Sequence, residues 1–391
     1  MMPEEKYMRR AIELAKKGSG RVNPNPLVGA VIVKDGQILG EGYHECYGQL
    51  HAERNAIAHA KKLGNDIKGS TIYVTLEPCS HYGKQPPCAK ALIEEKIAKV
   101  VVGSDDPNPL VSGRGYEMLR ESGVEVITHF LKEECDAVND VFFHFIKTGT
   151  PYVAMKYAMT MDGKIACHTG DSKWVTGEKS REYVQVLRNH YKGIMAGIGT
   201  VLADDPMLNC RMEGGRDPVR IICDDHLRIP FSSKLVSSAR KQPLIVACLP
   251  EKDRDILKVR SSLEMDGFSS VSEKEAALRQ AGAKIIYIPP DNRGHISLTY
   301  LMKELGEQKI DGILLEGGGV LNESALRQGI VRRVYCFIAP KIFGGRNART
   351  PVEGQGVALA ADAWQFEKIN LMTFGDDIML EYKKQFVKKE S

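Results

Sequence analysis

Short apolar runs recur along this chain, and segments with a helical spacing of apolar residues separate them. This alternation constrains the fold most strongly, because strands and helices that follow one another in turn pack into layered α/β domains. In the first third of the chain, strands are predicted at 27–43, where Asp35-Gly36 favours a hairpin turn, and at 70–79, 99–106 and 124–130. Helices are predicted at 9–18, 51–64, 86–97 and 113–123. Together they predict a first α/β domain whose sheet is mostly buried.

A second α/β domain is predicted in the remainder of the chain. The stretch "TGTP" at 148–151 interrupts the pattern, and apolar strands followed by helices begin again after it. Such repeats favour a mainly parallel sheet. A chain of 391 residues is also too long for a single hydrophobic core. We therefore predict domains at 1–147 and 148–391, with the charged segment 251–280 as a peripheral insertion.

The charge of the chain is nearly balanced. Its 54 basic and 50 acidic residues are dispersed, so the sequence lacks the basic stripe that is typical of nucleic-acid-binding proteins. It contains no run of about 18 apolar residues, and its N-terminal segment lacks the apolar region of a secretory signal. Its nine cysteines favour metal ligation or burial over a disulfide framework. We therefore expect a cytoplasmic protein that acts on neither membranes nor nucleic acids.

Three residues of the first domain have the pattern of a zinc site. His51 begins a predicted helix, Cys79 follows a predicted strand, and Cys88 lies at the start of the next helix. Zinc binds imidazole and thiolate ligands tetrahedrally, and its catalytic sites use three protein ligands and leave the fourth position to water. A helix N-terminus also favours the thiolate form of a cysteine. The sequence therefore predicts a catalytic zinc site.

Glu53 lies two residues after His51, so on a helix the two side chains point about 200° apart and do not share a face. This makes Glu53 a poor fourth ligand, but from the first helical turn it can reach the water on the metal and carry protons. Zinc-dependent base deaminases use an H-x-E motif in this way, followed by P-C-x-x-C. Here eight residues separate Cys79 from Cys88. We predict Glu53 as the catalytic residue and assign no function to the neighbouring His44 and Cys46.

Two other interpretations of the zinc motif are considered. A nucleic-acid or nucleoside base deaminase with an appended nucleotide-binding domain needs a basic surface bearing aromatic residues, which the dispersed charge disfavours. The long spacing between the two cysteines also counts against it. A binding scaffold that zinc merely stabilises needs a closed site with four protein ligands.

The second domain contains one signal for a nucleotide. In "LLEGGGVLN", residues 314–322, glycines follow an apolar strand and precede a helix. Such a turn lets backbone N–H groups approach a phosphate. The glycines are not in the order G-x-G-x-x-G, so a Rossmann site is not predicted. A tight turn and a cofactor site fit this segment equally well.

The first domain resembles the deaminase half of the bifunctional deaminase/reductase family of riboflavin biosynthesis, in the motifs "NPNPLVGAVIVKDGQILGEGYH", "HAERNAI", "TLEPCSHYGKQPPC" and "DPNPLVSGRG". The second domain resembles the reductase half of that family, in "MTMDGKIACHTGDSKWVTG", "GIGTVLADDPMLNCR" and "LLEGGGVLNESAL". The resemblance covers nearly the whole chain. It implies a cytidine-deaminase-like three-layer α/β domain followed by a dihydrofolate-reductase-like domain, with Zn²⁺ and NADPH as cofactors.

For the first domain, the resemblance implies hydrolytic deamination of 2,5-diamino-6-(5-phosphoribosylamino)pyrimidin-4-one. Zinc would be held by His51, Cys79 and Cys88, and Asn25 would hydrogen-bond the base. The candidates for binding the phosphoribosyl arm are Lys84, Asp106, Asn108 and Arg114. The segment "DPNP" at 106–109 is equally suited to a simple β-turn.

For the second domain, the resemblance implies that NADPH reduces the ribosyl group to ribityl. The implied NADPH contacts are Ala158, Trp174, Thr200, Asp204, Gly318, Gly319, Val320, Leu321, Asn322, Glu323 and Ser324. The implied substrate contacts are Ser172, Arg188, Leu208, Arg211 and Glu316, of which the arginines suit a phosphate and the glutamate suits ribose hydroxyls. The plainer alternatives are Trp174 as a core aromatic, Arg188 as a solvated residue and Asp204 as a helix cap or turn former. We expect a homo-oligomer that acts on a small phosphoribosylamino-pyrimidine.

Overall fold

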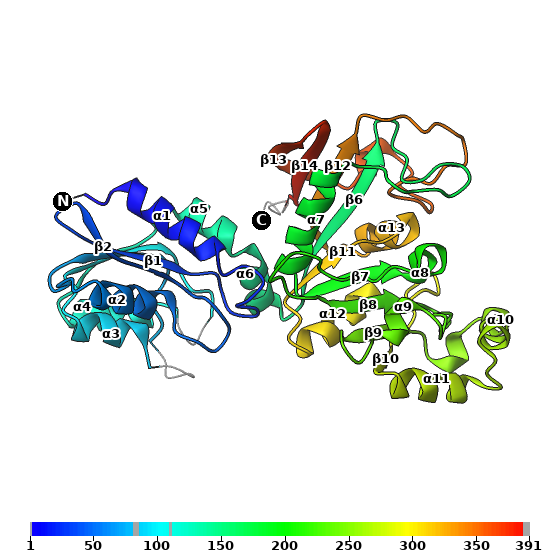
Figure 1. Ribbon diagram of the computed structural model, residues 1–391, viewed down its shortest axis with the longest axis horizontal. Helices are drawn as coiled ribbons and strands as arrows, with labels where there is room; N and C mark the ends of the chain where they lie inside the picture. The colour runs from blue at the N-terminus through cyan, green and yellow to red at the C-terminus, as the bar shows by residue number, and fades with distance from the viewer. Residues whose placement is uncertain (1, 81–85, 109–111, 386–391) are drawn as a thin grey trace. The chain divides into compact units, whose positions relative to one another are not determined.

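A computed structural model describes residues 2–80, 86–108 and 112–385 of the chain. It divides into two compact units, Met1–Gly149 and Thr150–Ser391. Each unit is an α/β structure with a sheet of its own (Figure 1).

The first unit contains a five-stranded sheet in the order β2-β1-β3-β4-β5. Its strands are β1 (Gly29–Lys34), β2 (Gln37–Tyr43), β3 (Thr71–Leu76), β4 (Lys99–Ser104) and β5 (Glu125–Ile127). Its helices are α1 (Glu5–Lys16), α2 (Ala52–Lys62), α3 (Cys88–Glu94), α4 (Arg114–Glu121), α5 (Lys132–Val138) and α6 (Asp140–Thr148). Strand β1 is antiparallel to β2 and β3, whereas β3, β4 and β5 run parallel. The carboxyl ends of these three strands therefore lie along one edge of the sheet.

Helices cover both faces of this sheet, which gives three layers (Figure 1). Alternate residues of a strand point to opposite faces. Accordingly Val31 and Val33 pack with α1 and α5, whereas Ala30 and Ile32 pack with α2, α3 and α4. The apolar run of β1 is thus buried on both sides, as the sequence predicts.

Two glycines of β2 allow α2 to approach the sheet unusually closely. A Cβ at Gly40 would lie 2.4 Å from the carbonyl oxygen of Ala56, and one at Gly42 would lie 2.3 Å from the backbone nitrogen of Ala56. Both distances are shorter than any side chain permits. The position of α2, whose N-terminal cap is His51, depends on this backbone contact.

The second unit contains a nine-stranded sheet in the order β10-β9-β8-β7-β11-β6-β12-β14-β13. Its strands are β6 (Tyr152–Thr160), β7 (Gly193–Gly197), β8 (Val219–Cys223), β9 (Leu244–Cys248), β10 (Ala283–Tyr287), β11 (Gly312–Leu315), β12 (Val331–Ala339), β13 (Phe366–Phe374) and β14 (Asp377–Lys384). Its helices are α7 (Glu178–His190), α8 (Ile198–Asp204), α9 (Lys234–Ser237), α10 (Ile256–Asp266), α11 (Val271–Gln280), α12 (Leu298–Glu307) and α13 (Gly319–Arg327), with 3₁₀ turns η1 (Glu251–Asp253) and η2 (Ala360–Asp362).

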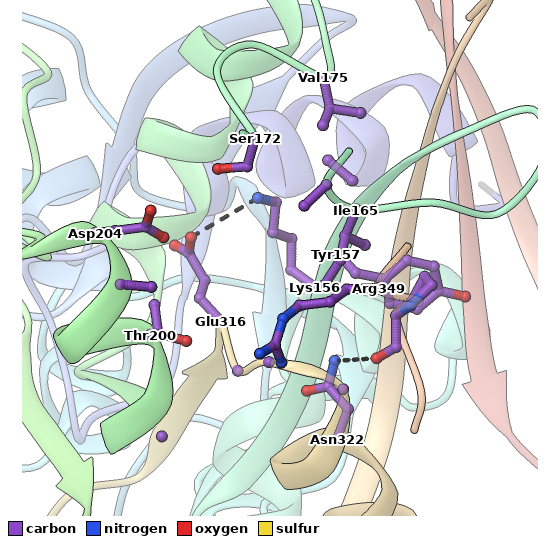
Figure 2. A pocket seen from close by; sticks show the side chains of 18 of the residues that line it. Lys156, Tyr157, Ile165, Ser172, Val175, Thr200, Asp204, Glu316, Asn322 and Arg349 are labelled. Carbon is purple, nitrogen blue, oxygen red and sulfur yellow. Dashed lines mark hydrogen bonds and ion pairs between the residues drawn. The ribbon is translucent and has the colours of Figure 1, made fainter. Parts of the chain in front are cut away.

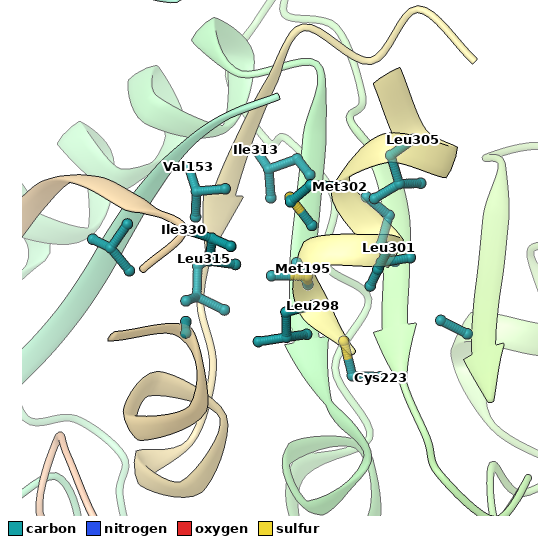
Figure 3. Close-up of a cluster of buried hydrophobic side chains, with 14 of the residues drawn as sticks. Val153, Met195, Cys223, Leu298, Leu301, Met302, Leu305, Ile313, Leu315 and Ile330 are labelled. Atoms are coloured by element: carbon teal, nitrogen blue, oxygen red, sulfur yellow. The ribbon is translucent and has the colours of Figure 1, made fainter. Parts of the chain in front are cut away.

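Strands β6 to β12 form one parallel array, as predicted. At one end of the sheet, β14 pairs antiparallel with β12 and forms an antiparallel hairpin with β13. One face packs on α12 and α13 through Leu301, Leu305 and Leu326, part of the cluster in Figure 3. The other face packs on α8, α9 and α11. The sheet is therefore covered on both sides, as parallel sheets require.

The structure differs from the sequence prediction in two places. The C-terminal hairpin was not predicted, because its strands are half exposed and polar residues interrupt their apolar pattern. The segment 251–280 forms η1, α10 and α11 between β9 and β10. Among the described residues, we find no helix with the length and apolar character needed to cross a bilayer.

Gly42→Ala tests the close contact between α2 and β2. The added methyl group must push α2 away, so we expect the first unit to lose about 1–3 kcal/mol of stability. Both tryptophans, Trp174 and Trp364, lie in the second unit. Urea unfolding followed by far-UV circular dichroism should show a transition at a lower urea concentration than in the wild type. The unfolding curve followed by tryptophan fluorescence should be the same as in the wild type. An unchanged dichroism curve would contradict the predicted contact, and a shifted fluorescence curve would contradict its confinement to the first unit.

Candidate functional site

His51, Cys79 and Cys88 meet in the first unit. The Nδ1 atom of His51 lies 3.6 Å from the Sγ atom of Cys79 and 3.5 Å from that of Cys88. The three ligand atoms all lie within 4.8 Å of one another. One imidazole and two thiols at this spacing can converge on a single ion, and this donor set suits zinc.

The fold explains why these three residues converge. His51 caps the N-terminus of α2, and Cys88 is the first residue of α3. Cys79 follows β3, whose carboxyl end lies at the same edge of the sheet. The backbone N–H of Cys88 donates a hydrogen bond of 3.3 Å to the Cys79 sulfur. Contacts with the Cys88 thiol and the His51 ring hold the pKa of Cys79 below its usual range, so a thiolate is favoured there.

Glu53 lies beside the three ligands in the first turn of α2 and is only 3% exposed. Burial raises the pKa of its carboxyl to about 7, and the nearby Cys79 charge acts in the same direction. A carboxyl group that titrates near neutral pH both accepts and returns a proton readily. This is the property that a proton-transfer residue needs.

His44, to which we assigned no function from the sequence, connects Asn25 to the metal ligands. Its Nδ1 lies 3.0 Å from the carbonyl oxygen of Leu50, so this nitrogen carries the hydrogen. Its Nε2 then accepts a hydrogen bond from the Asn25 amide at 3.2 Å. The ring centroids of His44 and His51 lie 5.3 Å apart. The amide of Asn25 is therefore oriented next to the zinc ligands, and no spacing in the sequence indicates this.

Three of the four candidates for the phosphoribosyl arm lie in the segment from the end of β4 to the start of α4. Asp106 is buried and accepts a hydrogen bond of 2.8 Å from the backbone of Asn108. Arg114 is the first residue of α4. Lys84 lies outside the described residues.

The second unit contains a cavity of about 580 Å³ between β6, α7, α8 and the N-terminus of α13 (Figure 2). Most of the residues predicted to bind NADPH or substrate line it. From the NADPH set these are Ala158, Trp174, Thr200, Asp204, Gly318, Gly319, Val320, Leu321 and Asn322. From the substrate set they are Ser172, Arg188, Arg211 and Glu316.

Leu208, Glu323 and Ser324 do not line this cavity. Leu208 packs into the hydrophobic core beside α8 and α9. Glu323 and Ser324 lie in the second turn of α13, and the helical rotation carries Glu323 toward Arg293, with which it forms an ion pair of 3.1 Å. The assignment of these three residues as ligand contacts stays a prediction.

The glycine segment at the start of α13 suits a phosphate. A Cβ at Gly318 would meet only the Thr200 hydroxyl, 3.7 Å away, so this backbone faces open space. A Cβ at Gly319 would lie 2.4 Å from the Glu353 side chain. No side chain caps the N-terminus of α13, a helix of nine residues. Its backbone N–H groups and its dipole therefore favour an anionic group of a cofactor in the cavity.

Three charged side chains form the polar end of the cavity. The guanidinium of Arg188 makes two hydrogen bonds to the Glu316 carboxylate, of 2.7 and 3.0 Å. The ammonium of Lys156 lies 3.7 Å from the same carboxylate (Figure 2). Burial acts to raise the pKa of Glu316, but the Arg188 and Lys156 charges outweigh it and lower this pKa to about 2. Burial lowers the pKa of Lys156.

The sequence reasoning missed Lys156. Its signal is a lysine in the middle of the apolar strand "YVAMKYAM", where a charge needs a partner. The plainer interpretations of two predicted residues are wrong. Trp174 is 59% exposed and stacks against the Arg181 guanidinium at 4.5 Å, so it is no core aromatic. Arg188 is ion-paired and only 12% exposed. Asp204 does not cap the start of α8 but ends it, where it can still form the turn that follows.

Comparisons with known proteins match a known family to each unit. The family model for the cytidine and deoxycytidylate deaminase zinc-binding region matches residues 1–104. The family model for the RibD C-terminal domain matches residues 151–380.

Full-length relatives and solved structures extend this likeness over the whole chain. The riboflavin biosynthesis protein RibD of Actinobacillus pleuropneumoniae is 49% identical, over 97% of this chain and 95% of its own. The structure of Acinetobacter baumannii RibD matches with a TM-score of 0.82 at 33% identity, over 98% of this chain and 99% of that chain. The Thermotoga maritima diaminohydroxyphosphoribosylaminopyrimidine deaminase/5-amino-6-(5-phosphoribosylamino)uracil reductase matches with a TM-score of 0.82 at 38% identity, over 97% and 98% of the two chains.

Fold and sites together define a zinc-binding deaminase domain joined to a reductase domain of the NADPH-dependent type. The chain belongs to the RibD family of riboflavin biosynthesis proteins. It is a bifunctional deaminase and reductase, and it acts on small phosphoribosylamino-pyrimidines. The predicted family, fold classes and cofactors are confirmed, and the alternative of a nucleic-acid base deaminase is not favoured.

Replacing a metal ligand should release the metal. We expect about one zinc per chain in the wild type, since structural and catalytic sites of this donor type bind a single ion. Cys88→Ser should lose most of it, because a hydroxyl is a much poorer zinc ligand than a thiolate. Metal content measured by inductively coupled plasma mass spectrometry checks this. Cys46→Ser is the matched control and should keep its zinc; full zinc in Cys88→Ser would contradict the ligand set.

Proposed function

We propose that the first unit replaces the 2-amino group of 2,5-diamino-6-(5-phosphoribosylamino)pyrimidin-4-one with oxygen from water and releases ammonia. The observation that carries this proposal is the buried Glu53 carboxyl beside His51, Cys79 and Cys88. Zinc, when bound, supplies the Lewis acid that makes water a nucleophile at neutral pH. The Thermotoga maritima relative, a diaminohydroxyphosphoribosylaminopyrimidine deaminase, supports the same substrate.

The side chains of the first unit transfer the protons and bind the substrate. Glu53 takes the proton of the attacking water and delivers it to the departing amine. Asn25 hydrogen-bonds the pyrimidine, and His44 positions the Asn25 amide by accepting its N–H. Asn108 and Arg114 receive the phosphoribosyl arm, with Asp106 holding the Asn108 backbone in place.

In the second unit, we propose that the deaminated product is reduced from ribosyl to ribityl. NADPH, when bound, supplies the hydride. The start of α13, Thr200, Asp204 and the exposed face of Trp174 are the groups proposed to bind NADPH. Glu316 accepts hydrogen bonds from ribose hydroxyls, Arg211 binds the substrate phosphate, and Lys156 gives a proton to the sugar oxygen as the hydride arrives.

We further propose that residues 1–147 are the deaminase domain and 148–391 the reductase domain. The two compact units and the ranges of the two family models support this division. A homo-oligomer is supported by the edge strand β13, which exposes Ile369 and Leu371. A cytoplasmic location is supported by the nine cysteines, none of which is paired in a disulfide.

Glu53→Gln should abolish proton transfer without removing the metal. The amide has the shape of the carboxyl group but accepts no proton, so ammonia release should fall about 100- to 10,000-fold. Zinc content should stay at the wild-type level. Reduction of the deaminated intermediate, supplied directly, serves as the internal control and should be unchanged. Near-normal ammonia release would refute the role of Glu53.

Arg211→Ala should weaken binding of the phosphorylated intermediate in the reductase. Losing a charged hydrogen bond to phosphate should raise its KM about 10- to 100-fold. Affinity for NADPH, measured by isothermal titration calorimetry, and ammonia release should both stay at wild-type values. Arg260→Ala, on α10, is the matched control. An equal rise of KM in the two variants would show that Arg211 does not bind the phosphate.

A further inference from the structure

Glu77 is a buried carboxylate that neither binds the metal nor faces solvent. It lies between β3 and the ligand Cys79 and is only 4% exposed. Its backbone N–H donates a hydrogen bond of 2.9 Å to the carbonyl oxygen of Ser104, at the end of β4. A carboxylate in such a place requires hydrogen-bond partners, because burying it alone is very costly.

The partners of this carboxylate come from the loop after β4 and from the first turn of α4. Its Oε2 accepts a hydrogen bond of 3.2 Å from the backbone N–H of Gly113, and its Oε1 accepts one of 3.2 Å from Gly115. Burial raises the pKa of Glu77, while backbone N–H groups of Gly113, Asp106 and Gly115 oppose this rise. The carboxylate thus contacts both ends of the loop.

Two glycines make this arrangement feasible. Gly113 has a φ of 80°, in the left-handed region that side chains disfavour. At Gly115 a Cβ would lie 2.2 Å from the Pro78 carbonyl oxygen and 3.2 Å from Oε1 of Glu77. The start of α4 therefore lies directly against the residue that precedes the metal ligand Cys79.

Three candidates for the phosphoribosyl arm, Asp106, Asn108 and Arg114, lie close in the chain to the backbone groups that Glu77 binds. Strands β3 and β4 are parallel and pair Leu76 with Ser104, so Cys79 and Asp106 leave the sheet at the same edge. Arg114 lies in the chain between Gly113 and Gly115, whose N–H groups the carboxylate binds. Asn108 lies between Asp106 and Gly113.

We propose that Glu77 is a positioning residue that holds Asp106 and the Gly113–Gly115 backbone, which flank the candidates Asn108 and Arg114, against the strand end bearing Cys79. It thereby sets the distance between the reacting carbon of the pyrimidine and the groups that receive its phosphoribosyl arm. This inference rests on the proposed role of Asn108 and Arg114 in binding that arm. A purely structural role would instead lower stability and impair every deaminase substrate alike.

Glu77→Gln tests the inference. The amide keeps the size of the carboxylate, but its NH₂ end cannot accept the second backbone N–H. We expect the KM for the phosphorylated diaminopyrimidinone to rise at least about tenfold, while kcat and zinc content stay near wild type. The KM for the same substrate without its phosphate should not change. Glu94→Gln, an exposed glutamate on α3, is the matched control. Far-UV circular dichroism during urea unfolding monitors folding of the first unit, and reduction of supplied intermediate monitors the second.

Two further variants separate this inference from the proposed function. Arg114→Ala and Asn108→Ala should each raise the KM for the phosphorylated substrate only. If neither does, the proposed arm site is wrong and the role of Glu77 fails with it. If Arg114→Ala raises this KM but Glu77→Gln does not, only the Glu77 inference is wrong. Loss of zinc in Glu77→Gln, or an equal rise of KM for both substrates, would show a structural role and overturn the inference too.

Discussion

The deaminase centre depends on a backbone contact between α2 and β2. Because Gly40 and Gly42 have no side chains, α2 lies directly on the sheet, and its N-terminus brings His51 to the edge where β3 ends. Cys79 and Cys88 join it there, and the N–H of Cys88 supports the Cys79 sulfur. The same approach buries Glu53, which raises its pKa to about 7. Metal binding and proton transfer thus follow from one packing arrangement.

The reductase cavity follows from a different constraint. Its polar end is built from charges that are buried together, with Arg188 and Lys156 sharing the Glu316 carboxylate. Its other end is open backbone at the start of α13, where glycine leaves room for an anion. The charged end suits a sugar phosphate, and the open end at α13 suits a dinucleotide. The exposed Trp174 adds an aromatic face. The two activities therefore use separate sites with unrelated chemistry in one chain.

Much of this organisation is predictable from the sequence. The apolar runs predicted the layered sheets. The residue types at 51, 79 and 88 predicted the zinc ligands, because these residues lie at predicted helix starts and at a predicted strand end. Contacts set by tertiary packing were not predictable. His44 and Lys156 acquire their partners only when the chain folds, and the turn of α13 directs Glu323 toward Arg293 rather than into the cavity. The C-terminal hairpin was not predicted, because most residues of its edge strand β13 are exposed and its apolar residues follow no clear period.

Deamination requires a zinc centre with three protein ligands, of which Glu53 is not one. X-ray absorption spectroscopy at the zinc edge of the purified protein can count these ligands. We expect one imidazole nitrogen and two sulfurs, the latter at about 2.3 Å, with the remaining position open to solvent. The spectrum should be the same in Glu53→Gln. A fourth protein ligand, such as a second imidazole from His44, or a changed ligand shell in that variant, would refute this assignment.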